Sequence, residues 1–410
     1  MRFFTLEINR LEIMEEQNYG DWSLEIHERL SGKRVPIGGS LELTQRCNNK
    51  CVHCYNNLAT GDQEALAKEL SLNEHYRIID EITECGCLWL LLTGGEIFLR
   101  KDFLDIYTYA KKKGLLITLF TNGTLITPDI AGYLAQLPPF SIEITLYGSS
   151  KETYESITGV PGSYERCLNG IHLLMERKLP LKLKTMVIAQ NIHEIFDLKR
   201  FVEEELGLDF KFDAMINPRR DCSLSPLEVR LTPLEVVELD LEDTDRVTEW
   251  RRFSALFHKP VVNSDKADKL YLCGGGYQSF AIDSFGQLTA CVLSTSSYDL
   301  RQGSFKEGWE EHLLTLRQKK ITRKTKCTAC QIKSMCGMCP ANSELECRDA
   351  EAPVQFLCEV AHLRAYAFGL HIAPHGDCEY CGGGSRYEDM METVEDLKRR
   401  YEIGSPPPAD

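Results

Sequence analysis

Short apolar runs alternate with amphipathic segments from Gly38 onward. Six of these runs read as strands, and the segments between them have helical periodicity. Several predicted helices carry start signals, such as the capping box at 71–74 and the threonines that precede a proline, Thr127 and Thr232. Strands that alternate with helices predict right-handed β-α-β units and a parallel sheet. The predicted strands are 40–44, 88–93, 115–120, 141–146, 181–188 and 209–215.

The segments on either side of this region lack the alternation. The first residues predict a small hairpin or a docking element for a peptide partner. After the sixth strand, prolines and an acidic run at 235–245 predict a linker with one or two helices, and we interpret the acidic run as a solvated helix face. A charged amphipathic helix is predicted over 387–401, followed by a disordered end. The predicted parts are a preamble (1–37), an α/β domain (38–215), a helical linker (216–270), a cysteine-rich domain (271–360) and a partly disordered helical tail (361–410).

Composition and charge narrow the class of protein. With 43% hydrophobic and 26% charged residues, the chain has the composition of a soluble globular protein. No apolar run reaches the roughly 20 residues of a membrane helix. Acidic residues come too early for a signal peptide, so we expect a cytoplasmic protein. A net charge of −14 argues against nucleic acid as a partner, and seventeen cysteines in a leaderless chain argue for metal binding.

Three of the cysteines lie in one loop directly after the first predicted strand. Cys47, Cys51 and Cys54 have the spacing Cys-x3-Cys-x2-Cys. Thiolates favour iron–sulfur clusters and zinc. A [4Fe-4S] cluster normally takes four cysteines, so three would leave one iron open to another ligand. The alternative is a zinc knuckle with His53 as fourth ligand, which is awkward because His53 directly precedes Cys54.

This spacing resembles that of the radical S-adenosylmethionine (radical SAM) enzymes. The resemblance implies a partial (β/α)6 TIM-type barrel in which Cys47, Cys51 and Cys54 hold the catalytic [4Fe-4S] cluster. In that family the open iron chelates S-adenosylmethionine (SAM), and an electron from a donor such as ferredoxin or flavodoxin leads to a 5′-deoxyadenosyl radical.

Two further motifs lie where parallel sheets place their active sites, at the carboxyl ends of predicted strands. Gly94, Gly95 and Glu96 resemble the family's GGE motif, which implies that they bind the amino group of SAM. Glycines there also let a ligand approach the backbone closely. Asn122 belongs to a turn that resembles the family's TNG turn beside the cofactor.

Four more side chains are candidate SAM contacts. In the family that the chain resembles, polar side chains on the fourth strand meet the ribose or the carboxylate of SAM. Glu143 and Thr145 share one face of this strand, and Lys184 on the fifth strand could reach the same carboxylate. The alternative for these three is a role inside the barrel, satisfied by neighbours. His53 is placed beside the adenine.

A second group of cysteines begins at Cys273. Two Cys-x2-Cys pairs lie five residues apart, whereas zinc ribbons usually separate them by about 15–20 residues. An iron–sulfur fold therefore fits better, with zinc as the alternative. The order resembles the SPASM domain, the auxiliary-cluster extension of many peptide-modifying radical SAM enzymes, although that family closes the central run with Cys-x3-Cys. The resemblance implies one auxiliary [4Fe-4S] cluster on Cys327, Cys330, Cys336 and Cys358, and another on Cys273, Cys291 and Cys339.

The fourth ligand of the second auxiliary cluster is open between Cys347, water and the substrate. Cys378 and Cys381 are either an extra ligand pair or free thiols on a flexible arm, and we favour the arm.

The expected activity is radical oxidation that cross-links a ribosomally made peptide. Oxidation of a small molecule such as a tetrapyrrole precursor, or modification of a partner enzyme, is the alternative within this class. A non-catalytic electron carrier or zinc scaffold would explain the cysteines but not the Gly94-Gly95-Glu96 motif.

Overall fold

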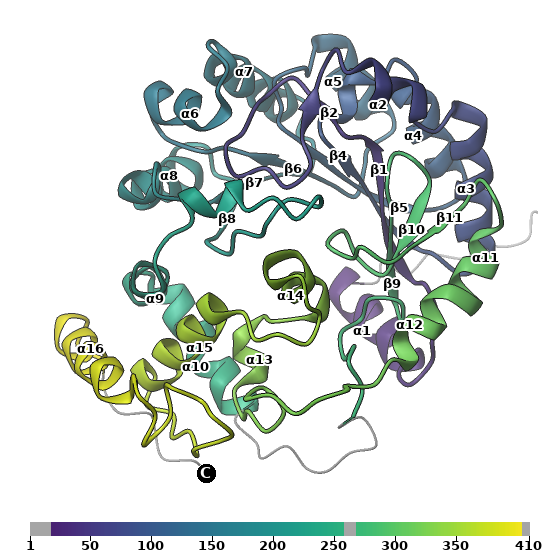
Figure 1. Cartoon of the computed structure of the whole chain (residues 1–410). Coiled ribbons are helices and arrows are strands. Elements are labelled where there is room, and N and C mark those ends of the chain that lie inside the picture. The colour runs from purple at the N-terminus through teal and green to yellow at the C-terminus, as the bar shows by residue number, and fades with distance from the viewer. Residues whose placement is uncertain (1–17, 258–267, 404–410) are drawn as a thin grey trace, which may run out of the picture.

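A curved, mostly parallel sheet forms the centre of the molecule, a computed structural model that describes residues 18–257 and 268–403 (Figure 1). Its strand order is β11-β10-β9-β1-β4-β5-β6-β7-β8. The strands are β1 (Gly38–Thr44), β4 (Trp89–Gly94), β5 (Leu116–Thr121), β6 (Ser141–Thr145), β7 (Leu181–Met186), β8 (Asp209–Asp213), β9 (Ser279–Ile282), β10 (Gln287–Thr289) and β11 (Ser297–Asp299), with a separate pair β2 (Arg46–Cys47) and β3 (Leu58–Ala59).

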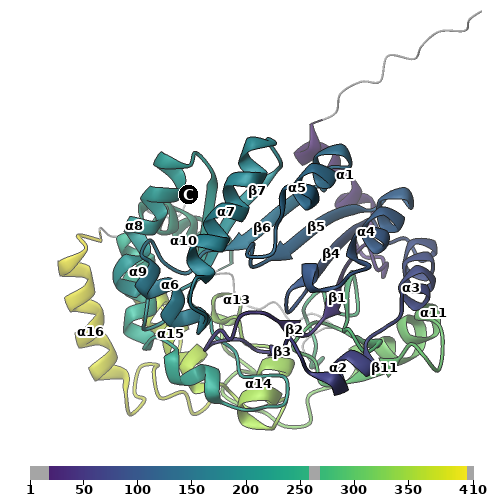
Figure 2. The same cartoon turned by 90° about the horizontal axis from the view of Figure 1, so that it is seen from above.

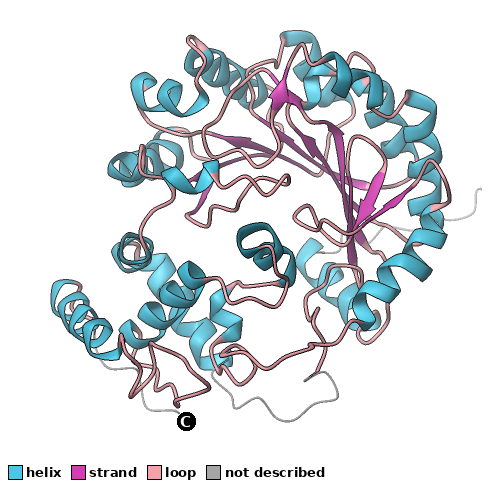
Figure 3. Ribbon diagram, viewed as in Figure 1, coloured by secondary structure: helices cyan, strands magenta, loops and turns pink. Residues whose placement is uncertain are grey.

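The predicted partial barrel is confirmed. Strands β1 and β4 to β8 pair in sequence order, all parallel, and their ends lie within two residues of the predicted ends. Helices α3 to α8 cover the convex face of the sheet, and α13 to α15 lie across its open side (Figures 1 and 2). Figure 3 shows the same division between an outer layer of helices and an inner sheet.

The helices are α1 (Tyr19–Arg29), α2 (Gln63–Lys68), α3 (Leu72–Glu84), α4 (Phe103–Lys112), α5 (Pro128–Gln136), α6 (Lys151–Thr158), α7 (Ser163–Glu176), α8 (Ile195–Arg200), α9 (Pro233–Glu242), α10 (Thr244–Phe257), α11 (Phe305–Glu307), α12 (Leu314–Gln318), α13 (Lys333–Cys336), α14 (Pro340–Cys347), α15 (Gln355–Ala367) and α16 (Tyr387–Arg400). None of these helices is both long and apolar enough to cross a bilayer, within the part of the chain that the structure describes.

Helix α3 shows how the sequence sets one of these elements. The predicted capping box forms: the Ser71 hydroxyl accepts from the backbone N–H of Glu74, and the Glu74 carboxylate accepts from the N–H of Ser71. Ile78, Ile79 and Ile82 share the buried face, which packs into the main core against the sheet. Burying each such side chain stabilises the fold by about 1.5–3 kcal/mol.

The cysteine-rich region shares the barrel's sheet. Strand β9 pairs in parallel with β1, and β10 and β11 continue the sheet as antiparallel strands. Gly39 of β1 allows this pairing, because a Cβ there would lie 2.2 Å from the Phe280 ring. The predicted boundary at residue 271 therefore does not separate two sheets.

Other expectations differ from the structure. The preamble does not form a hairpin in its described part, where Asn18 caps the helix α1; residues 1–17 lie outside the described residues. The acidic run is not a solvated face throughout, because Asp240 is fully buried between α9 and α15 and accepts from Arg246 and Arg364. Hydrogen-bonded cations compensate the burial of this carboxylate.

The C-terminal tail contains the predicted helix, α16, but not the flexible arm. Cys378 and Cys381 are buried in a second hydrophobic core together with Tyr380 and Val394. The expectation of two free thiols on an open arm is therefore wrong, because apolar burial holds this segment against α15 and α16. The proline-rich end at 404–410 lies outside the described residues.

Candidate active site

A cavity of about 390 Å³ opens at the carboxyl ends of the parallel strands. The three thiols of the cysteine loop line it. So do six of the eight predicted SAM contacts, and only Glu96 and Glu143 stand outside its wall. The structure thus brings together residues from β2, β4, β5, β6 and β7. The lining side chains from the prediction are Cys47, Cys51, Cys54, His53, Gly94, Gly95, Asn122, Thr145 and Lys184.

The donor atoms in this loop suit a cluster better than a single ion. A tetrahedral zinc ion with Zn–S bonds of about 2.3 Å would draw its sulfurs to about 3.8 Å from one another. Among the described residues, a single set of three or more Cys, His, Asp or Glu side chains has all its ligand atoms within 4.8 Å, and Cys47, Cys51, Cys54 and His53 are not in that set. Among the described residues that line the cavity, Cys47, Cys51 and Cys54 are the only cysteines. These side chains therefore do not form the compact set that a single zinc ion needs, and the three-thiolate [4Fe-4S] cluster stays the prediction for this loop.

The two glycines after β4 are required by the chain itself. A Cβ on Gly94, whose φ is +135°, would lie 2.0 Å from the carbonyl oxygen of Thr44, and one on Gly95 would lie 2.3 Å from that of Arg46. Two backbone hydrogen bonds close the contact, from Gly95 N to Thr44 O at 2.7 Å and from Glu96 N to Arg46 O at 3.0 Å. The glycines let the turn dock directly under the cysteine loop, a reason that the motif alone did not indicate.

Glu96 is not among the residues that line the cavity. Its fully buried carboxylate accepts from the Thr121 hydroxyl at 2.7 Å, the Asn122 N–H at 2.8 Å and the Phe98 N–H at 3.2 Å. Burial raises the pKa of Glu96 to about 7. In this geometry the side chain holds the turn that carries Asn122, and its contact with the amino group of SAM stays a prediction.

Asn122 lies where it can order the cysteine loop. Its Nδ2 donates to the Asn48 side-chain oxygen at 2.9 Å and lies 3.6 Å from the Cys47 sulfur. The backbone N–H of Asn49 also donates to that sulfur, at 3.4 Å. N–H groups aimed at a thiolate stabilise its charge.

The far wall carries one cation. Lys184 lies over the Phe120 ring and forms an ion pair of 3.1 Å with Glu143. Burial lowers the pKa of Lys184 to about 8. His53 packs edge-on against Tyr147, and burial lowers the pKa of His53 to about 4, so this imidazole is neutral at physiological pH.

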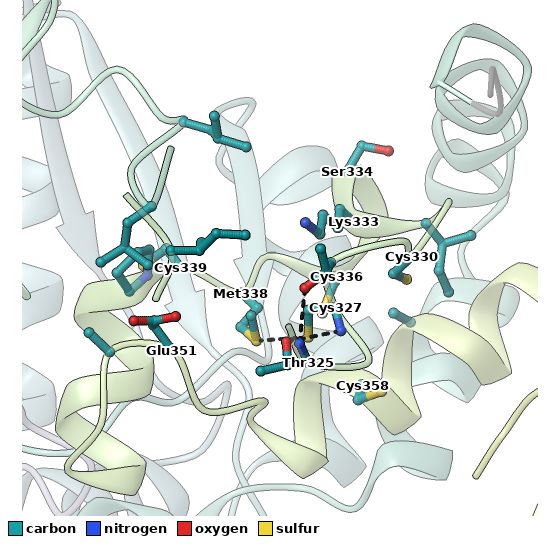
Figure 4. A pocket seen from close by; sticks show the side chains of 18 of the residues that line it. Thr325, Cys327, Cys330, Lys333, Ser334, Cys336, Met338, Cys339, Glu351 and Cys358 are labelled. Atoms are coloured by element: carbon teal, nitrogen blue, oxygen red, sulfur yellow. Dashed lines mark hydrogen bonds between the residues drawn. The ribbon is translucent and has the colours of Figure 1, made fainter. Parts of the chain in front are cut away.

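A second cavity, of about 340 Å³, gathers the C-terminal cysteines (Figure 4). In Figure 4, Cys327, Cys336, Cys330 and Cys358 lie on one side and Cys339 on the other. Cys291 does not line this cavity. It follows β10, and the next two residues, Val292 and Leu293, line the first cavity. The lining cysteines are Cys273, Cys327, Cys330, Cys336, Cys339 and Cys358.

Cys347 is poorly placed as a further ligand. It ends α14, whereas Cys339 caps the start of the same helix. Eight residues of helix at about 1.5 Å each separate the two by about 12 Å along the axis. Cys347 is exposed and, among the described residues, is not part of the cavity wall.

Comparison with known proteins identifies the domain that contains the first cavity. A family model described as the Radical SAM superfamily matches residues 41–202, which contain the cysteine loop and the strands that line the first cavity. Residues 41–202 form a radical SAM domain. The chain accordingly contains a domain of this enzyme superfamily.

Individual relatives of the radical SAM enzyme differ in their named substrates. The chain is 27% identical to the AdoMet-dependent heme synthase of Methanosarcina barkeri (strain Fusaro / DSM 804) over 74% of this chain and 90% of that protein. It is 30% identical to the PqqA peptide cyclase of Rhodopseudomonas palustris (strain ATCC BAA-98 / CGA009) over 43% and 45%. The crystal structure of Streptococcus suis SuiB bound to precursor peptide SuiA matches with a TM-score of 0.63 and 16% identity, over 86% and 85%, which shows a shared fold.

The radical SAM domain also has supports that the sequence analysis missed. Glu42 of β1 is buried and accepts from Tyr55 at 3.3 Å and Asn56 at 3.1 Å, and its ion pair with Arg220 measures 2.7 Å. Arg219 donates to the Cys54 carbonyl at 3.1 Å. Both arginines belong to the predicted linker. Their position just beyond the sixth strand, at the carboxyl end of the sheet, is the sequence feature that could have pointed to them.

Proposed function

We propose that this enzyme holds a [4Fe-4S] cluster on Cys47, Cys51 and Cys54, binds SAM in the first cavity, and oxidises a ribosomally made peptide at the barrel mouth. The supporting observation is that the wall of this cavity joins the cysteine loop to the segment that follows Cys291. When bound, the cluster and SAM would supply a 5′-deoxyadenosyl radical, and auxiliary clusters on the C-terminal cysteines would accept the electron that the oxidised substrate gives up.

The chain's own residues would orient these groups. Gly94 and Gly95 hold the cysteine loop against β4, and Asn122 donates toward the Cys47 sulfur. The Lys184 ammonium lines the cavity and would attract the carboxylate of SAM. His53 supplies a neutral, mostly apolar wall.

The charge of the cavity favours a peptide. Lys184 is the only charged side chain among the described residues that line it, and Glu143 already pairs with this cation. A tetrapyrrole precursor carries several carboxylates, which would need cations at the mouth, whereas a peptide segment can bind through backbone hydrogen bonds and apolar contacts. The peptide cyclase among the relatives is in line with this choice.

A tetrapyrrole is the second candidate, because the heme synthase similarity extends over 74% of this chain. The two substrates are distinguished by incubating the anaerobically reconstituted enzyme with SAM, a reductant and either coproporphyrin or short peptides encoded beside the gene. Mass spectrometry that finds a peptide lighter by two hydrogens supports the proposal. Conversion of the porphyrin with no change in any peptide would assign the enzyme to the tetrapyrrole class.

The cluster assignment is tested without substrate. Reconstituted enzyme with dithionite should convert SAM slowly to 5′-deoxyadenosine, and Cys51→Ala should abolish this product. Cys347→Ala is the matched control, since that thiol is exposed on α14 and should leave the rate unchanged. Wild-type turnover in Cys51→Ala would refute the assignment.

A further inference from the structure

Four side chains meet in the C-terminal part of the chain, and of these only His362 also lines the second cavity. They are His362 on α15, and His375, Cys378 and Cys381 on the loop between α15 and α16. All four are buried, with exposed fractions of 1%, 8%, 6% and 1%. Their ligand atoms all lie within 4.8 Å of one another. Among the described residues, no other group of three or more His, Cys, Asp or Glu side chains is this compact. The auxiliary cysteines are not part of it.

The spacing of the donor atoms fits one tetrahedral ion. The Cys378 sulfur lies 3.4 Å and the Cys381 sulfur 3.6 Å from Nε2 of His362, and the Cys381 sulfur lies 3.4 Å from Nδ1 of His375. Zn–S bonds of about 2.3 Å and Zn–N bonds of about 2.0–2.1 Å at tetrahedral angles give S–N edges of about 3.6 Å. Hydrogen bonds alone account for fewer of these short distances than a bound ion does. The single lone pair on Nε2 of His362 can accept from only one of the two thiols.

His362 is oriented as a ligand. Its Nδ1 lies 2.8 Å from the backbone carbonyl oxygen of Cys358, one turn earlier on α15. A carbonyl can only accept, so Nδ1 carries the proton and the lone pair of Nε2 points at Cys378 and Cys381. Metal-binding histidines are commonly fixed in this way. His375 makes a competing contact of 3.0 Å from its Nδ1 to the Ala373 carbonyl, which the ion would have to replace.

The loop is built to hold a compact knuckle. Gly384 follows the second cysteine closely, and a Cβ there would lie 2.5 Å from the carbonyl oxygen of Cys378. Between the cysteines, Glu379 forms an ion pair of 2.7 Å with the buried Lys326. This loop has no regular secondary structure from 370 to 386, so a metal ion would replace the stabilisation that helices or strands give elsewhere.

We propose that His362, His375, Cys378 and Cys381 bind one structural zinc ion. Two imidazoles and two thiolates with no open position form a typical closed zinc site. Cys358 and His362 lie four residues apart on α15 and so share a face. The ion therefore braces the helix turn that presents Cys358 to the auxiliary cavity.

The test is the metal content of the full-length enzyme, purified and reconstituted anaerobically and then desalted. Elemental analysis should find one zinc per chain beside the iron. His375→Ala with Cys381→Ala should lose that zinc and keep the iron of the radical SAM cluster. Cys327→Ala is the matched control, because its thiol lines the auxiliary cavity and its loss should reduce iron but not zinc.

A measurement on the wild-type enzyme covers the case in which the variant does not fold. X-ray absorption at the zinc edge should show two sulfurs at about 2.3 Å and two nitrogens at about 2.0–2.1 Å. Three results would overturn the proposal: no zinc in the wild-type enzyme supplied with Zn²⁺, zinc that is lost in Cys327→Ala, or a shell of three or four sulfurs. A three-sulfur shell together with zinc loss in Cys358→Ala would move the ion onto Cys358.

Discussion

The replacement of Gly95 by alanine tests whether the glycine pair serves the chain or the ligand. The new methyl carbon would lie 2.3 Å from the Arg46 carbonyl oxygen, whereas ordinary contacts begin at 3.4 Å, so the backbone before Cys47 must shift by about 1 Å. Such overpacking costs about 1–3 kcal/mol. The shift also stretches the hydrogen bonds from Gly95 N and Glu96 N, each of which contributes about 0.5–1.5 kcal/mol.

We therefore expect Gly95→Ala to lower the free energy of unfolding by about 2–4 kcal/mol. A displacement of about 1 Å in the cysteine loop should also reduce 5′-deoxyadenosine formation by up to about 100-fold. Thermal unfolding of the metal-free chain and the rate of SAM cleavage by the reconstituted enzyme measure the two effects separately. Gly132→Ala in α5 is the control, because its Cβ would meet no atom within 4 Å and alanine favours a helix by about 1 kcal/mol.

The two explanations of the glycine pair give different results. If the chain requires the glycine, both stability and iron content fall. If the glycine serves only the approach of SAM, stability and iron content stay at the wild-type level and only the KM for SAM rises. That second outcome would refute the steric argument.

Two further predictions follow from buried charges. Asp240→Asn should lower the free energy of unfolding in urea by about 3–5 kcal/mol, because it leaves buried cations unpaired. The control Glu238→Gln breaks a half-exposed ion pair with Arg400 and should cost less than about 1 kcal/mol. Equal effects of the two substitutions would contradict the role given to burial. Burial lowers the pKa of Lys184 to about 8, so its amine loses its charge above that pH. The KM for SAM should therefore rise above that pH in the wild-type enzyme. It should stay constant in Lys184→Arg, because the guanidinium remains charged. The same rise in both enzymes would show that another group titrates.

The sequence predicted the barrel well, because its information is local. Apolar runs separated by capped helices specify each β-α unit, and right-handed connections then leave little choice of topology. The cysteine loop, Asn122 and Lys184 were found for the same reason: each directly follows or lies in a strand, and the carboxyl ends of parallel strands meet at one edge.

The missed contacts join residues that are far apart in the chain. Glu42 and Arg220 form a buried ion pair across 178 positions, and Asp240 and Arg364 do so across 124. A charge pattern read locally predicts exposure for each of them, since isolated charges are rarely buried. Only the fold brings in the partner that makes burial tolerable.

The pairing of β9 with β1 has a consequence for how the two cavities work together. A cluster region on a flexible linker would place its cysteines at a variable distance from the barrel. Here the hairpin that leads to Cys291 is hydrogen-bonded to the edge of the barrel sheet, and its next two residues form part of the first cavity's wall. With the proposed auxiliary clusters bound, the shared sheet would fix the distance over which electrons pass between the two cavities, a distance that a linker would leave open. For the same reason, removal of residues after 270 would expose the edge of β1 and the Gly39 surface that Phe280 covers, and the barrel alone should aggregate.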